Sequence, residues 1–352
     1  MGFKKVLMLC LTCILVIAVA GCGTNNGNAG GNTGNTAGES SAAPEASAAP
    51  ETLAPIKVAL DWTPNTNHTG LYVAKELGYY EEEGLDVAIV QPGAAGADTM
   101  VTSGEAAFGI GYQEGLTVAR LQGVPLVSIA AIIQHNTSGF AAPKDRKITS
   151  PKDFEGKTYG GWGSPVEEAA MKAIMDPEGG DVKKVKIINM GEADFFTAVK
   201  RDIDFAWIFY AWTGIEAELR GEPVDMLYIK DYAPELDYYT PVLTTSEKQI
   251  ADHPEQVKAF VKATSRGYQY AIDHPEEAAA ILTKAVPDLD PELVLASQKW
   301  LSPKYTDDAP RWGEQKAEVW QNYADWMYGL KLLDKPLDAE AAFTNDFLPE
   351  SQ

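Results

Sequence analysis

Cysteine is nearly absent from this chain of 352 residues, which contains three. Two of them, Cys10 and Cys13, lie in an apolar run near the start, and Cys22 follows that run directly. With one cysteine beyond the run, the rest of the chain has no partner for an internal disulfide. It also lacks the paired cysteines of zinc-ribbon and redox motifs.

Basic residues and histidines are also scarce. The chain has 29 Lys and Arg against 50 Asp and Glu, a formal charge of −21, and four His. This negative excess repels a phosphate backbone, and no Lys/Arg-rich run offsets it locally, so we expect no nucleic-acid partner. No metal-ligand spacing, nucleophile elbow or GxxxxGK[ST] loop is present. We therefore predict no catalytic residue, no metal site and no cofactor, and a small molecule as the partner.

The first residues determine the predicted compartment. Lys4-Lys5 precede the apolar run at 6–20, which is short for a membrane span, and small residues lead directly into Cys22. This pattern is typical of a lipoprotein signal peptide. We predict cleavage after residue 21, lipidation of Cys22, including palmitate, and anchoring on the extracytoplasmic face of the cell membrane. An ordinary signal peptide that ends near a cysteine is the alternative.

Residues 22–55 are dominated by Gly, Asn, Ala, Ser, Thr and Pro. Such a composition buries too little apolar surface to become ordered, so we predict a disordered linker. Flexible-coil scaling gives this tether a reach of roughly 30 Å between the anchor and the folded body.

From residue 56 onward, short apolar runs alternate with amphipathic stretches, which is typical of an α/β fold. Strands are predicted at 56–60, 85–90, 106–110, 124–133, 158–160, 185–188 and 204–208. Helices are predicted at 70–77, 97–103, 115–122, 165–174, 193–200, 214–220, 254–274, 275–285, 291–301 and 312–329. We expect a monomer with two lobes, an interlobe cleft and a helix-rich C-terminus. Lobe 1 would comprise 56–140 plus 243–352 and lobe 2 would comprise 141–242, with hinge crossings near 140 and 243.

The loops after the predicted strands are rich in rings, amides and carboxylates, and ligands bind at such loops in α/β folds. The loop after the first strand contributes Asp61, Trp62, Asn65 and His68, although capping of the next helix and burial of the tryptophan are alternative roles. The other candidates are Tyr112, Gln113, Gln134, Gly163, Ser164, Tyr210, Trp212, Glu216 and Tyr238. The glycine-rich corner at 160–165 fits either an anion site at a helix start or a tight turn. These loops suit a flat, nitrogen-rich ligand that stacks on rings such as Trp62 and Tyr210.

The string at residues 60–74, LDWTPNTNHTGLYVA, followed by GYY at 78–80 and EGLDV at 83–87, resembles the thiamine-pyrimidine-precursor family of substrate-binding proteins. The resemblance continues through SGEAAFG at 103–109 to HPEQV at 253–257 and covers nearly all of 56–330. It implies a periplasmic-binding-protein-like fold of type II. It also implies a lipid-anchored receptor that delivers a formylaminopyrimidine-type precursor to an ABC permease for thiamine salvage.

The same family includes eukaryotic enzymes that make the pyrimidine from bound pyridoxal phosphate and a histidine. Those enzymes carry a cysteine-rich iron-binding motif and a cofactor lysine after the third strand. The corresponding stretches here, 236–242 and 109–115, contain no Cys and no Lys, respectively. We therefore expect a binding protein, with a synthase-like enzyme as an alternative. The ligand could also be a related heteroaromatic, an alkanesulfonate or nitrate, but the candidate loops offer no basic residue to a bare anion.

Overall fold

The computed structural model describes residues 52–93, 95–191 and 193–350. The predicted signal peptide, Cys22 and nearly all of the predicted linker lie outside the described residues. Within the described ranges, no helix is both long enough and apolar enough to cross a membrane.

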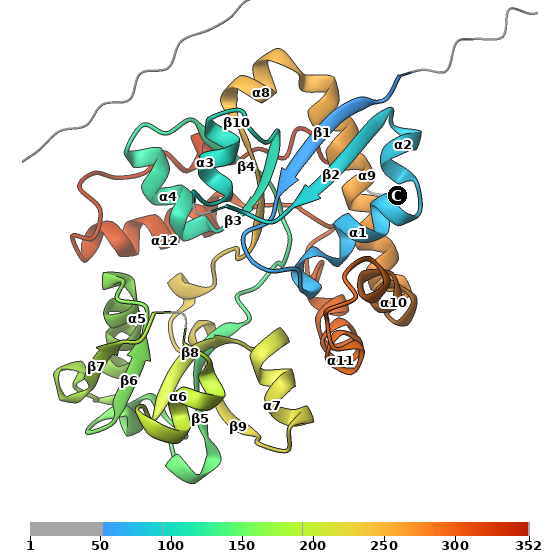
Figure 1. The fold of residues 1–352 in the computed structure, drawn as a ribbon. Helices are drawn as coiled ribbons and strands as arrows, with labels where there is room; N and C mark the ends of the chain where they lie inside the picture. The colour runs from blue at the N-terminus through green and yellow to red at the C-terminus, as the bar shows by residue number, and fades with distance from the viewer. Residues whose placement is uncertain (1–51, 94, 192, 351–352) are drawn as a thin grey trace, which may run out of the picture. The chain divides into compact units, whose positions relative to one another are not determined.

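The first sheet has the strand order β2-β1-β3-β10-β4, with β1 parallel to both of its neighbours and β10 antiparallel to β3 and β4 (Figure 1). Its strands are β1 (Ala54–Ala59), β2 (Leu85–Val90), β3 (Phe108–Gly111), β4 (Leu126–Ala131) and β10 (Val242–Ser246). The helices that connect its first strands are α1 (Thr69–Glu76), α2 (Tyr79–Glu82), α3 (Ala97–Thr102) and α4 (Gln113–Leu121).

The second sheet has the order β7-β6-β8-β5-β9, in which β6 is parallel to β7 and β8, whereas β5 is antiparallel to β8 and β9. Its strands are β5 (Ser138–Pro143), β6 (Thr158–Gly161), β7 (Lys186–Asn189), β8 (Phe205–Phe209) and β9 (Val224–Tyr228). The intervening helices are α5 (Pro165–Met175), α6 (Phe195–Arg201), a π-helical turn η6 (Tyr210–Gly214) and α7 (Ile215–Leu219).

The C-terminal part is helical, with α8 (Glu247–Asp252), α9 (Pro254–Asp273), α10 (Pro275–Ala285), α11 (Pro291–Leu301) and α12 (Ala317–Gly329). Helix α9 covers the first sheet, where the Phe260 ring stacks on Phe108 with centroids 3.9 Å apart. Helix α9 also packs tightly on α1, because a Cβ at Gly267 would lie 2.0 Å from the carbonyl oxygen of Gly70. Glycine at this position therefore permits the two backbones to meet.

One predicted helix begins later than expected. The helix predicted at 312–329 begins at Ala317, because Gly313 forms a β-bridge with Ala131 and has a φ of +87°, which is not helical. The crossing expected near 140 corresponds to the segment just before β5, which begins at Ser138. The chain therefore passes between the sheets in segments 132–137 and 229–241, which separate β4 from β5 and β9 from β10.

Helix α12 contributes side chains to the cores of both lobes. Its Trp320 packs in a cluster with Leu116 of α4, whereas Tyr323 and Met327 pack in the cluster of the second sheet. The two sheets and this shared helix form the predicted two-lobed α/β fold.

Candidate functional site

The carboxyl-terminal ends of β1, β2 and β3 lie at one edge of the first sheet, because these strands run parallel. The segments that follow them carry Asp61, Asp98, Tyr112 and Glu114. Loops at this edge form the ligand sites of open α/β sheets. We call this set of segments the acidic edge.

Asp61 is held by two donors. Nε2 of His68 lies 2.6 Å from Oδ1 of Asp61, and the hydroxyl of Tyr112 donates to Oδ2. Nδ1 of His68 accepts the backbone N–H of Asn65 at 3.1 Å, so the ring hydrogen on Nε2 points at Asp61. Burial acts to raise the pKa of Asp61, but the His68 ring and the two hydrogen bonds lower it overall. Asp61 is therefore a buried carboxylate with both oxygens occupied.

Asn65 and His68 belong to the framework of this loop. The Asn65 side chain accepts the N–H of Asn67 at 2.9 Å and donates to the carbonyl of Thr63 at 3.0 Å, which caps the short helix η1 (Thr66–His68). His68 is fully buried. These two residues match the capping alternative, and they orient Asp61 through the hydrogen bonds described above.

Two tryptophans are half-exposed at strand ends. Trp62, after β1, is 50% exposed, and Trp162, after β6 in the other lobe, is 51% exposed. The Trp162 ring packs edge-on against Trp207 with centroids 5.6 Å apart. Among the described tryptophans, only these two are exposed to this extent. Trp162 was absent from the predicted site, although its place after a strand in a glycine-rich corner was a signal for it.

The glycine-rich corner at 160–165 carries its own carboxylate. The backbone N–H groups of Trp162, Gly163 and Ser164 donate to Glu167 at 3.1, 2.8 and 2.7 Å. The hydroxyl of Tyr159 donates to the same carboxylate at 2.7 Å. Gly163 has a φ of +89°, which favours glycine, and Ser164 caps α5. Glu167 thus takes the place of the anion that one prediction put at this corner.

The candidates that follow β8 contact the helices of the first lobe. The ring centroids of Tyr210 and Trp300 lie 5.1 Å apart, and the hydroxyl of Tyr210 donates to Glu218. Trp212 is half-buried against the cluster formed by α10 and α11. Glu216 forms an ion pair with Arg220, four positions further along the chain.

Helix α11 connects this segment to the acidic edge. Ser297 donates to the carbonyl of Ala211 in η6, and its hydroxyl lies 2.6 Å from that of Thr66. One serine therefore joins the loop after β1 to the loop after β8.

Three predicted site residues lie buried at the junction of the lobes. Gln113 accepts the N–H of Tyr239 at 2.8 Å and donates to the carbonyl of Val319 at 3.2 Å. Gln134 donates to the carbonyl of Glu314 at 3.0 Å. The Tyr238 ring packs against Tyr323 with centroids 4.6 Å apart. Since both glutamine side chains bind backbone groups, they connect the crossings to α4 and the C-terminal segment.

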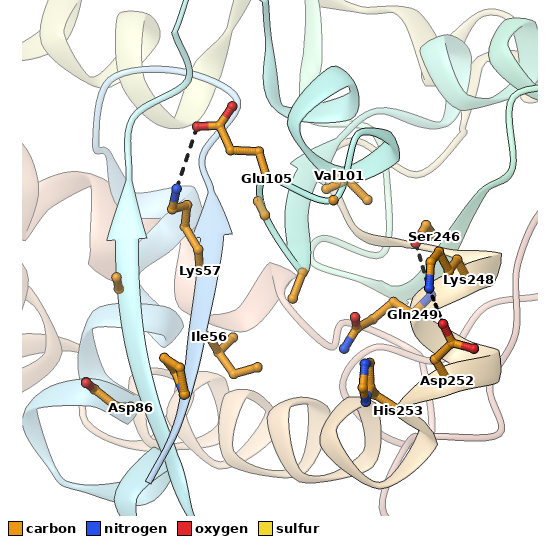
Figure 2. A pocket seen from close by; sticks show the side chains of 15 residues that line it. Ile56, Lys57, Asp86, Val101, Glu105, Ser246, Lys248, Gln249, Asp252 and His253 are labelled. Atoms are coloured by element: carbon orange, nitrogen blue, oxygen red, sulfur yellow. Dashed lines mark hydrogen bonds and ion pairs between the residues drawn. The ribbon is translucent and has the colours of Figure 1, made fainter.

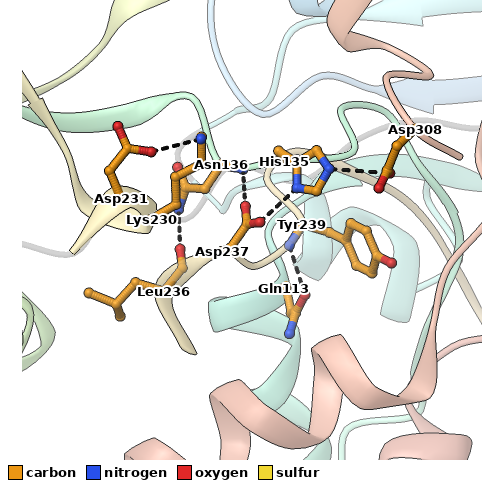
Figure 3. Close-up of polar contacts among 9 residues, drawn as sticks. All are labelled: Gln113, His135, Asn136, Lys230, Asp231, Leu236, Asp237, Tyr239 and Asp308. Carbon is orange, nitrogen blue, oxygen red and sulfur yellow. Dashed lines mark hydrogen bonds and ion pairs between the residues drawn. The ribbon is translucent and has the colours of Figure 1, made fainter. Parts of the chain in front are cut away.

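A polar network that was missed in the sequence joins the two crossings (Figure 3). Nδ1 of His135 lies 2.6 Å from Oδ2 of Asp237, and its Nε2 lies 3.3 Å from Asp308. The N–H of Asn136 donates to the other oxygen of Asp237 at 2.9 Å. The hydrogen bond to Asp237 is the main cause that raises the pKa of His135 to about 9. We call His135, Asn136, Asp237 and Asp308 the crossing network.

Two carboxyl groups of the acidic edge were also absent from the predicted site. Oδ1 of Asp98 and Oε2 of Glu114 are buried and have no hydrogen-bond partner among the described residues. Burial raises the pKa of Asp98 to about 6 and that of Glu114 to about 7. In the sequence, only the positions of Asp98 and Glu114 after the strands β2 and β3 indicated that they belong to the site.

A hollow of about 510 Å³ lies at the opposite edge of the same sheet, where β1 and β3 begin (Figure 2). Its charged side chains are largely paired with each other, as Lys57 lies 3.6 Å from Glu105 and Lys248 pairs with Asp252. In the described ranges, no group of three or more His, Cys, Asp or Glu side chains is arranged to hold a metal ion.

The two-lobed fold is the one found in solved periplasmic binding proteins. The solved structure of the alkanesulfonate-binding protein SsuA from Xanthomonas axonopodis pv. citri superposes with a TM-score of 0.63 at 15% identity. The match covers 83% of this chain and 98% of that chain, and at this identity it shows the fold alone.

Residues 65–278 match the family described as NMT1/THI5 like, and the chain belongs to that family. The predicted resemblance is thereby confirmed. A formylaminopyrimidine-binding protein of Halalkalibacterium halodurans is 31% identical over 84% of this chain and 91% of its own length.

Further relatives in the family differ in their named functions. A 4-amino-5-hydroxymethyl-2-methylpyrimidine phosphate synthase of Legionella pneumophila is 30% identical over 84% of this chain and 93% of its own length. The riboflavin-binding protein RibY of Chloroflexus aurantiacus is 27% identical over 88% of this chain and 91% of its own length. The similarity to binding proteins and the similarity to a synthase thus each extend over most of this chain.

Proposed function

We propose that this protein is an extracytoplasmic solute-binding lipoprotein that captures a pyrimidine precursor of thiamine and delivers it to an ABC permease. The observation that carries the proposal is the arrangement after β1, where half-exposed Trp62 directly follows the buried carboxylate of Asp61. The formylaminopyrimidine-binding relative, at 31% identity over 91% of its length, supports the choice of ligand.

Stacking provides the apolar part of binding. Trp62 and Trp162 each present about half of their surface to solvent, and each follows a strand in a different lobe. A flat heterocycle placed on such rings buries apolar area and gains favourable ring–ring contact. Tyr210, whose ring already contacts Trp300 and Tyr228, is a second candidate for this role.

Movement of the lobes would couple binding to transport. The two crossings, 132–137 and 229–241, are the segments through which such a motion passes. A ligand that contacts both lobes favours the closed form by its differential affinity for that form. The permease would then recognise the closed, loaded protein.

We propose binding rather than synthesis because this chain lacks the residues that the synthase resemblance requires. The stretch 236–242 contains no Cys, and 109–115 contains no Lys. An enzyme of the synthase type would need both a metal-binding and a cofactor-binding group in these stretches.

Lipid anchoring at Cys22 is part of the proposal. The apolar run followed by small residues and Cys22 supports a lipoprotein leader, and the following Gly/Asn/Ala/Ser-rich stretch supports a tether. The protein would then work on the extracytoplasmic face, close to its permease.

Titration calorimetry of the chain without residues 1–21 tests the proposal. The ligands are formylaminopyrimidine, thiamine, riboflavin, an alkanesulfonate and nitrate. We expect the tightest binding for formylaminopyrimidine. Binding of the alkanesulfonate or riboflavin alone would overturn the proposed choice of ligand. Turnover that depends on iron and pyridoxal phosphate would overturn the proposed non-enzymatic role.

A further inference from the structure

The acidic edge contains acceptors that the protein itself leaves unfilled. Oδ1 of Asp98 and Oε2 of Glu114 are buried without a hydrogen-bond partner among the described residues, and no described Lys or Arg forms an ion pair with either group. Asp61 differs, because His68 and Tyr112 occupy both of its oxygens. Buried acceptors without partners are unfavourable, so such oxygens mark the place of a missing donor.

Three carboxyl groups act electrostatically on one tyrosine. Tyr112 donates to Asp61, and the charges of Asp61, Glu114 and Asp98 all act to raise the pKa of Tyr112. Asp98 lies over the end of β3, since a Cβ at Gly111 would be 2.9 Å from its Oδ1. The unfilled oxygens therefore belong to the same edge as the Asp61 loop and Trp62.

Another element carries an unpaired hydroxyl on which the charge of Glu114 acts. Tyr323 of α12 is fully buried, and its hydroxyl has no hydrogen-bond partner among the described residues. The charge of Glu114 acts to raise the pKa of both Tyr323 and Tyr238. The Tyr323 hydroxyl and Oε2 of Glu114 are both buried and unpaired, so each lacks a partner that a third group would supply.

We propose that Glu114 is the subsite that recognises the amidine edge of an aminoheterocycle, the exocyclic NH₂ together with the adjacent ring nitrogen. This inference rests on the proposed function and names the residues that select the ligand. The NH₂ group donates to one carboxyl oxygen, and the ring nitrogen and the carboxyl share one hydrogen. That hydrogen lies either on Oε2, which donates to the ring nitrogen, or on the ring nitrogen, which donates to the carboxylate.

The environment of Glu114 suits a shared hydrogen. Burial raises its pKa to about 7, so both protonation states are accessible near neutral pH. Its charge acts on Tyr112, Tyr238 and Tyr323, and the charges of Asp98 and Asp61 also act on Tyr112. None of these groups is cationic, and no described Lys or Arg forms an ion pair with Glu114, so a ligand can supply the positive partner.

A matched pair of ligands tests the subsite. The first is formylaminopyrimidine, and the second is its 4-oxo counterpart, in which an N–H and a carbonyl replace the ring nitrogen and the NH₂. We expect wild type to prefer the amino ligand strongly, because the oxo group faces an acceptor. Glu114→Gln keeps the shape but presents an NH₂, so the amino/oxo ratio of affinities should fall by roughly tenfold or more. Asp98→Asn should lower the ratio less.

Glu105→Gln is the control, because Glu105 is an exposed carboxylate at the opposite edge of the same sheet. Its amino/oxo ratio should equal that of wild type. A folded Glu114→Gln variant with an unchanged ratio overturns the subsite and leaves the proposed function standing. If wild type binds neither pyrimidine, both the subsite and the proposed function are overturned.

A second measurement needs no variant. Calorimetry of wild type at pH 8 in two buffers of different ionisation enthalpy reports the protons taken up on binding. A shared hydrogen requires an uptake that approaches one proton per ligand, since free Glu114 and the free ring are both mostly unprotonated at that pH. Binding of the amino ligand without proton uptake overturns the proposal, whatever the behaviour of the variants.

Discussion

The carboxylate of Asp237 accepts a hydrogen bond from His135 at 2.6 Å, and the two residues lie in the two different segments through which the chain crosses between its sheets. The second oxygen of Asp237 accepts the N–H of Asn136 at 2.9 Å. One carboxylate therefore ties both crossings together, and its partner His135 can gain or lose a charge.

His135→Gln is expected to destabilise the protein in a pH-dependent manner. The pKa of His135 is raised from 6.5 to about 9, so the stabilisation is fully present below pH 6.5 and disappears as the pH rises through about 9. The melting temperature of the variant should lie below that of wild type at pH 6, and the difference should shrink towards pH 10. His253→Gln, which changes an exposed histidine, is the control for thermal unfolding. A difference that stays constant with pH would show that the charge of His135 is irrelevant.

Trp62→Ala is expected to weaken ligand binding by about 1 to 3 kcal/mol, the range for loss of an aromatic stacking partner. Trp62→Phe should cost less, because the ring face remains. Since Trp62 is 50% exposed, folding should be little affected. Calorimetry measures the affinity, and Tyr328→Ala, at an exposed ring of α12, serves as the control. Equal affinity in Trp62→Ala and wild type would place the ligand elsewhere.

Trp162→Ala tests whether the second lobe contributes its own ring. If a ligand lies between the two lobes, this variant should also lose about 1 to 3 kcal/mol of binding free energy. A loss of affinity in Trp62→Ala alone would mean that the ligand stacks on the first lobe only, and Tyr210→Ala should then be compared.

Asp61→Asn is expected to lower the free energy of unfolding by about 1 to 3 kcal/mol at pH 7, because an amide NH₂ would face the donors of His68 or Tyr112. The pKa of Asp61 is lowered from 3.8, so its carboxylate stabilises the fold above that pH and the contribution is lost as the pH falls further. Urea unfolding at pH 7 and pH 3 should show a smaller difference at the lower pH. An equally stable variant at pH 7 would show that this carboxylate is dispensable for folding.

Cys22→Ala is expected to release the protein from the membrane fraction without changing ligand affinity, because the tether separates the anchor from the folded body. Cys10→Ala, inside the predicted leader, is the matched control and should remain anchored. Fractionation followed by immunoblotting measures the distribution. Retention of Cys22→Ala in the membrane at the wild-type level would refute lipidation at this residue.

Local signals made several elements of this fold predictable. The predicted helices 275–285 and 291–301 coincide with α10 and α11, and each begins with proline, which favours the first turn. The predicted strand 85–90 coincides with β2. By contrast, β10 was not predicted as a strand, because its place between β3 and β4 depends on pairing with residues more than a hundred positions away.

In the candidate site, too, contacts between residues close in the sequence were predictable. Asp61 and His68 are seven positions apart, and the segment that joins them contains the capping signals that bring them together. Ser164 and Glu167 have the spacing of a capping box, so the filled glycine-rich corner also follows from local chemistry.

Sequence alone determined the class of fold, the family and the aromatic, carboxylate-rich loops at strand ends, because periodicity, capping residues and short motifs act over a few positions. Only the tertiary structure decided which polar groups receive a partner from a distant segment. The pairing of His135 with Asp237, the bond from Ser297 to Ala211, and the unfilled oxygens of Asp98 and Glu114 all depend on contacts between distant segments. A buried carboxyl group becomes a binding group or a structural one according to whether the folded chain brings it a donor.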